Sequence, residues 1–282
     1  METIGVVGAG LMGADVAQLA VESGMNVILH DSDQPNLKAA HDIITGRLDR
    51  YVHEGRISSD ERRSIASRIK LHNNMKDLVN ADFIIECITE DLEAKRELFR
   101  QLDKICKPGV IFASNTSALS ITQMGAATQR AESVIGMHFM NPARPMKVVE
   151  LVCGLVTTRE TFEMAKSVAK RMGKKCVESK DYPGFVINRI MMPMINEAIF
   201  TLYEGAATAQ AIDKTMKLGM NLPMGPLELA DMIGLDVVLA VVEELYDGFG
   251  DPKYRPCPLL KMYVAAGYLG RKAGRGFHMY ET

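Results

Sequence analysis

IGVVGAGLMG, at residues 4–13, is the segment from which the fold of this chain can be inferred. A short apolar run predicts a strand, a GxGxxG pattern follows it directly, and a helical pattern comes next. The first glycine permits a tight turn, the second lets the backbone approach a pyrophosphate, and the third lets the helix pack on the strand. We therefore predict a dinucleotide phosphate site at the helix start, formed by Gly8, Gly10, Leu11, Met12 and Gly13.

A second apolar run, at residues 26–30, ends at Asp31. An acidic residue at this position accepts hydrogen bonds from the adenosine ribose, and its charge repels a ribose phosphate. The sequence therefore favours NAD over NADP. The alternative is a glycine turn that binds no nucleotide, with Asp31 as an ordinary turn residue.

Further apolar runs predict strands at 83–88, 110–113, 134–139 and 148–152, with a helix at 91–106 between the first two. Alternating strands and helices indicate an α/β Rossmann-like, doubly wound and mostly parallel sheet.

Two segments lie outside this alternation. About fifty residues before position 83 have apolar residues at helical spacing with a break at Gly55, which predicts an inserted helical hairpin. From Pro183 onward the pattern changes to long helical segments rich in Met, Leu and Ala. We expect an NAD-binding domain at 1–182 and an all-α domain at 183–282.

The composition is that of an ordinary globular protein, with 282 residues, 47% of them hydrophobic and 24% charged, and a net charge of −2. A charge near zero gives no general attraction for nucleic acid, and no apolar run reaches the roughly 18 residues of a membrane span. We therefore expect neither nucleic acid nor a membrane as a partner.

The five cysteines are scattered and form no CxxC pair, which argues against a disulfide framework and against a zinc site. We expect no metal and a reducing compartment. The glycine motif begins at Gly8, which leaves no room for a targeting peptide before the first predicted strand. The expected location is the cytoplasm.

A candidate acid–base pair follows the glycine motif. His138 ends the predicted strand in GMHFMNP, and Glu150 lies in the apolar run VVELV, where a carboxylate needs a partner. Glu150 could hold the imidazole in one tautomer and stabilise the imidazolium that forms when His138 takes a proton. Oxidation of an alcohol needs such a base. Alternatively, His138 is a core histidine and Glu150 a solvated strand residue.

Several long motifs also resemble one family, the short-chain 3-hydroxyacyl-CoA dehydrogenases, over essentially the whole chain. The motifs are GAGLMG at 8–13, SNTSALSI at 114–121, GMHFMNP at 136–142, MKVVELV at 146–152, PGFVINRI at 183–190, LPMGPLELADMIGLD at 222–236 and GRKAGRGF at 270–277.

The resemblance implies roles for matching residues. His138 would be the base and Glu150 its orienting partner, and Ser117 and Asn188 would hydrogen-bond the reacting oxygen and the substrate carbonyl. Glu90, Lys95 and Asn115 match positions near the nicotinamide end of NAD. The resemblance also implies a short-chain 3-hydroxyacyl-CoA such as 3-hydroxybutyryl-CoA as substrate, reduction of acetoacetyl-CoA as the reverse reaction, and a homodimer through the helical domain.

The phosphates of coenzyme A require local basic residues. The predicted hairpin is rich in arginine, and Arg56, just after the break at Gly55, is our candidate phosphate ligand. The same segment also contains acidic residues, so the alternative is a solvated helical face of mixed charge that binds no phosphate. Two other functions also stay open: a related NAD-dependent hydroxyacid or sugar-acid dehydrogenase without a thioester substrate, and a non-catalytic nucleotide-binding protein.

Overall fold

The structure is a computed structural model that describes residues 3–281. The chain separates into two compact units, one ending at Asp181 and the other starting at Tyr182. Within residues 3–281, every helix is too short or too polar to cross a membrane.

The first unit is built on an eight-stranded sheet with the order β3-β2-β1-β4-β5-β6-β7-β8. Its strands are β1 (Thr3–Val7), β2 (Asn26–His30), β3 (Ile69–His72), β4 (Phe83–Glu86), β5 (Ile111–Ser114), β6 (Val134–Phe139), β7 (Val148–Cys153) and β8 (Lys175–Lys180). Neighbouring strands are parallel, except that β6 and β7 are antiparallel. The predicted Rossmann-like, mostly parallel sheet is confirmed. The strand order reverses between β1 and β4, where doubly wound sheets bind their ligands.

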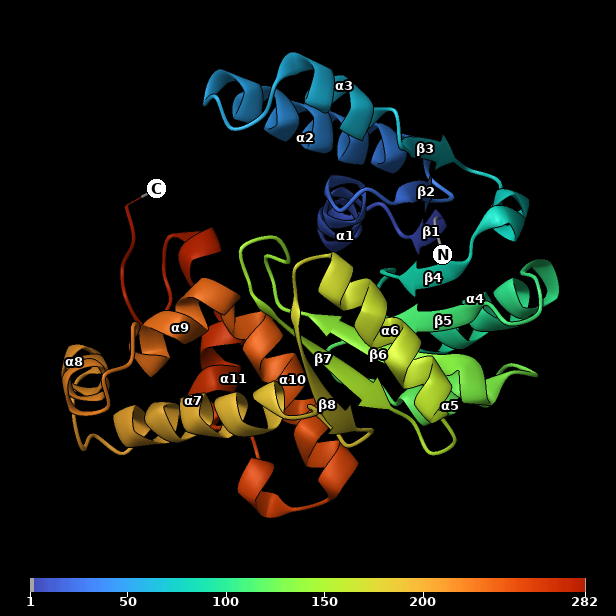
Figure 1. The fold of residues 1–282 in the computed structure, drawn as a ribbon. Coiled ribbons are helices and arrows are strands. Elements are labelled where there is room, and N and C mark those ends of the chain that lie inside the picture. Colours follow the sequence, from blue (N-terminus) through green and yellow to red (C-terminus); the bar gives the residue numbers. More distant parts are fainter. Residues whose placement is uncertain (1–2, 282) are drawn as a thin grey trace. The chain divides into compact units, whose positions relative to one another are not determined.

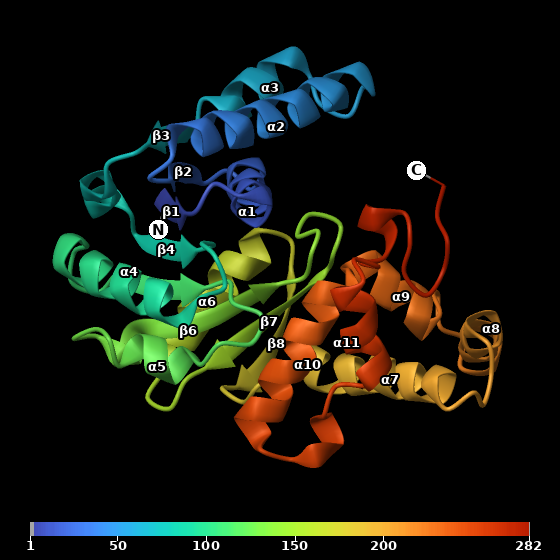
Figure 2. The ribbon, with the colours of Figure 1, turned by 180° about the vertical axis from the view of Figure 1, so that it is seen from behind.

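Helices cover both faces of this sheet. They are α1 (Leu11–Glu22), α2 (Gln34–His53), α3 (Ser59–Ala66), α4 (Leu92–Ile105), α5 (Ile121–Gly125) and α6 (Arg159–Arg171), with short 3₁₀ turns η1 (Met75–Asn80) and η2 (Ala131–Ser133). Helix α6 lies in front of the sheet in Figure 1, whereas α4 and α5 lie in front in Figure 2, which is the view from behind. One apolar core joins buried residues of α1, α2 and α6 to the strands.

Helix α4 illustrates why these residues form these elements. The Asp91 side chain accepts a hydrogen bond from the amide of Ala94 and so caps the helix start. Leu98, Phe99 and Leu102 are then spaced to share one buried face, while charged residues occupy the other. This packing holds the first turn of α4 against the end of β4.

The inserted segment differs from the prediction at one point. Helices α2 and α3, separated by Gly55 with φ of +68°, form the expected helical insertion. The third strand, however, is β3 at Ile69–His72, so the run at residues 83–88 is the fourth strand and ends earlier, at Glu86. Strand β3 is an edge strand with exposed residues, so its sequence lacks a continuous apolar run.

The second unit is helical. It contains α7 (Ile187–Tyr203), α8 (Ala209–Gly219), α9 (Pro226–Ile233), α10 (Leu235–Phe249) and α11 (Pro258–Ala265), with 3₁₀ turns η3 (Pro252–Tyr254) and η4 (Arg271–Ala273). These α-helices share one apolar core. Two buried carboxylates fix its connections: Asp213 of α8 accepts from the first amides of α9, and Asp231 accepts from the amides of Phe277 and His278.

Candidate active site

The carboxyl ends of β1, β2, β4, β5 and β6 meet at one edge of the sheet because these strands are parallel. The glycine loop, Asp31, Glu90, Ser117 and His138 all lie at or just after these ends. The topology therefore gathers the predicted cofactor and acid–base residues of the first unit.

The three glycines of the loop have different physical requirements. Gly8 has φ of +101°, and a Cβ there would lie 2.5 Å from the carbonyl oxygen of Cys87. A Cβ on Gly13 would collide with the carbonyl oxygen of Gly8. A Cβ on Gly10, in contrast, would meet no atom of a residue beyond its chain neighbours within 4 Å in the described part of the chain, so space lies open beside its backbone. That open space suits a phosphate group that approaches the loop closely.

The start of α1 suits the same group. Gly10 caps the helix without any side-chain hydrogen bond, and the first turn has no acidic residue, so the positive end of the helix is not neutralised. Leu11 is 55% exposed at this end, and Met12 packs against the core. The Asp31 carboxylate accepts from the amides of Ala9 (2.8 Å) and Asp33 (2.9 Å), which holds it beside the glycine loop. These features fit NAD.

His138 and Glu150 face each other across the antiparallel strands β6 and β7. They are directly paired in the register, so their side chains share a face of the sheet. Nδ1 of His138 is 2.8 Å from Oε2 of Glu150, and the residues are 7% and 1% exposed. The structure therefore brings the predicted pair into contact. With Nδ1 engaged by the carboxylate, Nε2 is the nitrogen that can exchange a proton.

Asn115 lies just after β5 and joins this strand end to β6. Its side-chain oxygen accepts from the backbone amide of Phe139 (2.9 Å), and its backbone amide donates to the carbonyl of Glu86. Asn115 thereby links the residue next to His138 with the end of β4.

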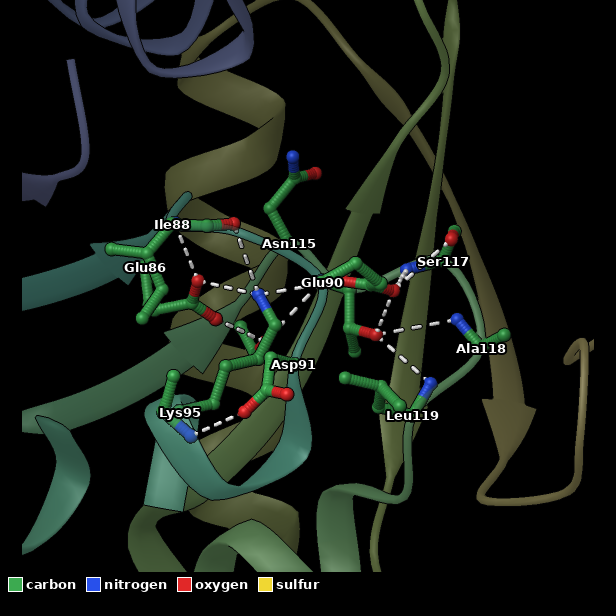
Figure 3. A network of polar contacts seen from close by, with 12 residues as sticks. Glu86, Ile88, Glu90, Asp91, Lys95, Asn115, Ser117, Ala118 and Leu119 are labelled. Carbon is green, nitrogen blue, oxygen red and sulfur yellow. Dashed lines mark hydrogen bonds and ion pairs between the residues drawn. The ribbon is translucent and has the colours of Figure 1, made fainter. Parts of the chain in front are cut away.

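Ser117 and Glu90 are also in contact. Oε1 of Glu90 accepts from the amide of Ser117 (2.8 Å) and from its hydroxyl (3.1 Å), as Figure 3 shows. It also accepts from the hydroxyl of Thr116 (2.5 Å). Burial disfavours the charged form of Glu90, but the nearby charge of Lys95 and these hydrogen bonds outweigh it and lower the pKa of Glu90.

Lys95 is almost fully buried, with 1% of its side chain exposed, and its ammonium lies 2.6 Å from Glu86 and 3.3 Å from Glu90. Lys95 is therefore a buried residue held by two carboxylates, although it lies in the first turns of a helix. Sequence reasoning missed Glu86, which is 0% exposed. The available signal was a carboxylate at the end of an apolar strand, followed nine residues later by a lysine on a helix.

Sequence reasoning also missed two residues that fix the loop between His138 and Glu150. The buried ammonium of Lys174 donates to the carbonyls of Ala143 (2.7 Å), Arg144 (3.1 Å) and Met146 (2.8 Å). Asp15 of α1 accepts from the amide of Ala143 at 3.0 Å. The loop is thus tied both to the helix of the glycine motif and to the residue before β8.

The remaining two predicted residues belong to other elements. Arg56 follows α2, with its side chain 57% exposed, its guanidinium 3.8 Å from the ring centroid of Tyr51 and 3.4 Å from Glu54. Asn188 lies in the first turn of α7 in the second unit and is 6% exposed.

Two family profiles match this chain: "3-hydroxyacyl-CoA dehydrogenase, NAD binding domain" at residues 3–182 and "3-hydroxyacyl-CoA dehydrogenase, C-terminal domain" at residues 184–280. A probable 3-hydroxybutyryl-CoA dehydrogenase of Bacillus subtilis is 49% identical over 100% of this chain and 98% of its own length. A 3-hydroxybutyryl-CoA dehydrogenase of Bradyrhizobium diazoefficiens is 47% identical over 99% of this chain and 96% of its own.

Solved structures agree with the sequence relatives. The crystal structure of (S)-3-hydroxybutyryl-CoA dehydrogenase from Ralstonia eutropha matches with a TM-score of 0.97 and 45% identity, covering 100% of both chains. The matches extend over both units of the chain. The chain therefore belongs to the 3-hydroxyacyl-CoA dehydrogenase family.

Proposed function

We propose that this chain is an NAD-dependent dehydrogenase that oxidises short-chain 3-hydroxyacyl-CoA, in particular 3-hydroxybutyryl-CoA, and reduces acetoacetyl-CoA in the reverse direction. Family membership supports the reaction. The observation that carries the chemistry is the buried contact between His138 and Glu150 at the sheet edge that also holds the glycine loop.

His138 acts as the base in the oxidative direction. Glu150 accepts a hydrogen bond from Nδ1, so Nε2 carries the lone pair that takes the hydroxyl proton of the substrate. The buried carboxylate also stabilises the imidazolium that results. In the reductive direction, the imidazolium returns this proton to the oxygen of the reduced ketone.

Ser117 and Asn188 bind the substrate in this proposal. The hydroxyl of Ser117 hydrogen-bonds the reacting oxygen, and Asn188 binds the substrate carbonyl, as their family motifs imply. Glu90, which contacts both the amide and the hydroxyl of Ser117, holds this serine in place.

NAD supplies the hydride acceptor. Gly8, Gly10, Leu11, Met12 and Gly13 hold its phosphates at the start of α1, and Asp31 binds the adenosine ribose and excludes a ribose phosphate. Glu90, Lys95 and Asn115 are assigned to the nicotinamide end, as their positions in the family motifs imply. Residues 1–182 form the NAD-binding domain, and residues 183–282 form the substrate and dimerisation domain of a cytoplasmic homodimer.

Arg56 is proposed to contact a phosphate of coenzyme A. Its guanidinium stacks on Tyr51 and remains more than half exposed, so its charge is held in place yet accessible to a ligand. The neighbouring carboxylate of Glu54 partly offsets this charge.

The test is the loss of NADH absorbance when the purified chain is mixed with acetoacetyl-CoA. NADPH in place of NADH, and free acetoacetate in place of the thioester, are the controls. We expect rapid oxidation only with NADH and the thioester together. Activity on the free acid alone would indicate a hydroxyacid dehydrogenase, and NADH binding without any turnover would contradict a catalytic function.

A further inference from the structure

The buried contact between Lys95 and Glu86 plays no part in the mechanism above. The Lys95 ammonium donates to Oε1 of Glu86 (2.6 Å) and more weakly to the carbonyl of Ile88 (3.4 Å), and it pairs with Oε2 of Glu90 at 3.3 Å. Figure 3 shows the ammonium between the two carboxylates. Each carboxylate thus holds the lysine from one side.

Glu86 is fixed from several directions. Its Oε1 also accepts from the amide of Ile88 (2.7 Å), and its Oε2 accepts from the hydroxyl of Ser114 (2.5 Å). Burial raises the pKa of Glu86, but the ammonium and the amide at Oε1 can only donate and therefore favour the carboxylate form. A fully buried carboxylate persists because it is paired and hydrogen-bonded in this way.

Glu90 continues the network toward the substrate. Its side chain is 39% exposed, one oxygen pairs with Lys95, and the other accepts from the amide and hydroxyl of Ser117. The contacts therefore run without a break from Glu86, inside the sheet, through Lys95 and Glu90 to Ser117.

We propose that Glu86 is a positioning residue of the dehydrogenase: it holds Lys95 protonated and in place, and Lys95 in turn holds the Glu90 carboxylate against Ser117. The inference rests on the proposed function, because that function assigns the reacting oxygen to Ser117. Without Glu86, Lys95 would keep only the partly exposed Glu90 as its counter-ion.

The charges around Lys95 support this assignment. Burial disfavours its ammonium, but the Glu86 carboxylate, and after it Glu90, outweigh burial and raise the pKa of Lys95. Burial raises the pKa of the thiol of Cys87, the residue after Glu86, so this thiol stays uncharged. Glu86 is thus the largest favourable charge on a lysine that has little solvent.

The other elements packed on α4 contribute little charge at this point. Helix α5 carries no ionisable side chain. In η1, Asp77 pairs with His72, and Lys76 is exposed. Strand β5 offers the neutral hydroxyl of Ser114 to Glu86.

The test is Glu86→Gln, assayed as oxidation of 3-hydroxybutyryl-CoA by NAD across pH. The readout for Lys95 is the loss of activity on the alkaline side of this profile. We expect kcat/KM to fall by about 10- to 100-fold, the range known when partners that orient a metal ligand are removed. We also expect activity to be lost at a lower pH than in the wild type, because a buried lysine without Glu86 releases its proton more readily.

Lys95→Arg separates this effect from general damage, since a guanidinium stays protonated throughout the range. In the Lys95→Arg background, Glu86→Gln should no longer move the alkaline limit. An equal movement in both backgrounds would show that Lys95 is not the titrating group and would overturn the proposal.

Two further variants complete the design. Glu97→Gln, on the exposed side of the same helix, should leave both the rate and the pH profile unchanged. Glu86→Asp keeps the charge but shortens the side chain, so kcat/KM should fall while the alkaline limit stays near that of the wild type; this variant serves if Glu86→Gln does not fold. Wild-type rates and profiles in the folded Glu86 variants would refute the role of Glu86, whereas a wild-type chain without activity would refute the proposed function instead.

Discussion

The side chain of His138 has one nitrogen committed to Glu150, and this asymmetry determines how the residue can act. A carboxylate that is 1% exposed needs a hydrogen-bond donor beside it, and Nδ1 provides one. The imidazole ring is thereby held in the tautomer that carries its proton on Nδ1, with Nε2 as the acceptor nitrogen. The two residues depend on each other for structure as well as for proton transfer.

His138→Gln tests this dependence. Glutamine can still donate to Glu150 but cannot take a proton, so turnover should fall by roughly 10²- to 10⁴-fold, as is typical of a lost general base. NADH should still bind, as measured by its fluorescence. Glu150→Gln should lower turnover in the same direction. Turnover near the wild-type value in His138→Gln would exclude this residue from the chemistry.

Arg56→Ala tests the proposed contact with coenzyme A. The side chain is largely exposed, so its loss should raise the KM for acetoacetyl-CoA by roughly three- to tenfold, equivalent to about 1 kcal/mol, with little change in the KM for NADH. Arg63→Ala, an exposed arginine of α3 that pairs with Asp60, is the matched control. A KM that is equal in the two variants would refute the assignment.

At the scale of the elements, β2 and β3 are joined by a buried histidine. Nδ1 of His30 lies 2.9 Å from the carbonyl oxygen of His72, and burial lowers the pKa of His30 below its ordinary value. The folded chain therefore binds this proton less readily than the unfolded chain, so the free energy of unfolding decreases as the pH falls below about 6.5.

His30→Gln should remove this part of the acid sensitivity. Each pKa unit of difference between the folded and unfolded chains corresponds to about 1.4 kcal/mol, so the melting temperature of the variant should decline less between pH 7 and pH 5 than that of the wild type. Thermal unfolding across this range measures the effect. If the melting temperatures of the two proteins decline equally with falling pH, His30 does not contribute to the acid sensitivity.

Much of the site was predictable at this scale because periodicity identifies strands and polar residues follow their ends. His138 and Glu150 each stood out against an apolar run, and the glycine loop had a strand before it and a helix after it. Strand β3 was missed because an edge strand with exposed residues lacks that contrast. Glu86 was missed because its partners, Lys95 and Ser114, meet it only once α4 has packed and β4 has paired with β5.

At the scale of the whole chain, the two units carry separate apolar cores. NAD is assigned to the first unit alone, and the substrate to residues of both units. Hydrogen exchange can test this division. NADH should slow exchange in the loop between β1 and α1 and at the ends of β2 and β4, because a bound ligand stabilises the backbone that it contacts. Acetoacetyl-CoA should add protection in the first turn of α7, around Asn188. NADH protection confined to the second unit would contradict the assignment.

The antiparallel pairing of β6 with β7 has one more consequence. Side chains alternate between the two faces of a strand, so a slip of a single residue in this hairpin would turn Glu150 away from His138. Proton transfer thus depends on the register of β6 and β7, whereas the choice of dinucleotide depends on Asp31, which follows β2 in a distant part of the sequence. Mutations could therefore alter the preferred dinucleotide during evolution while the acid–base chemistry is inherited unchanged.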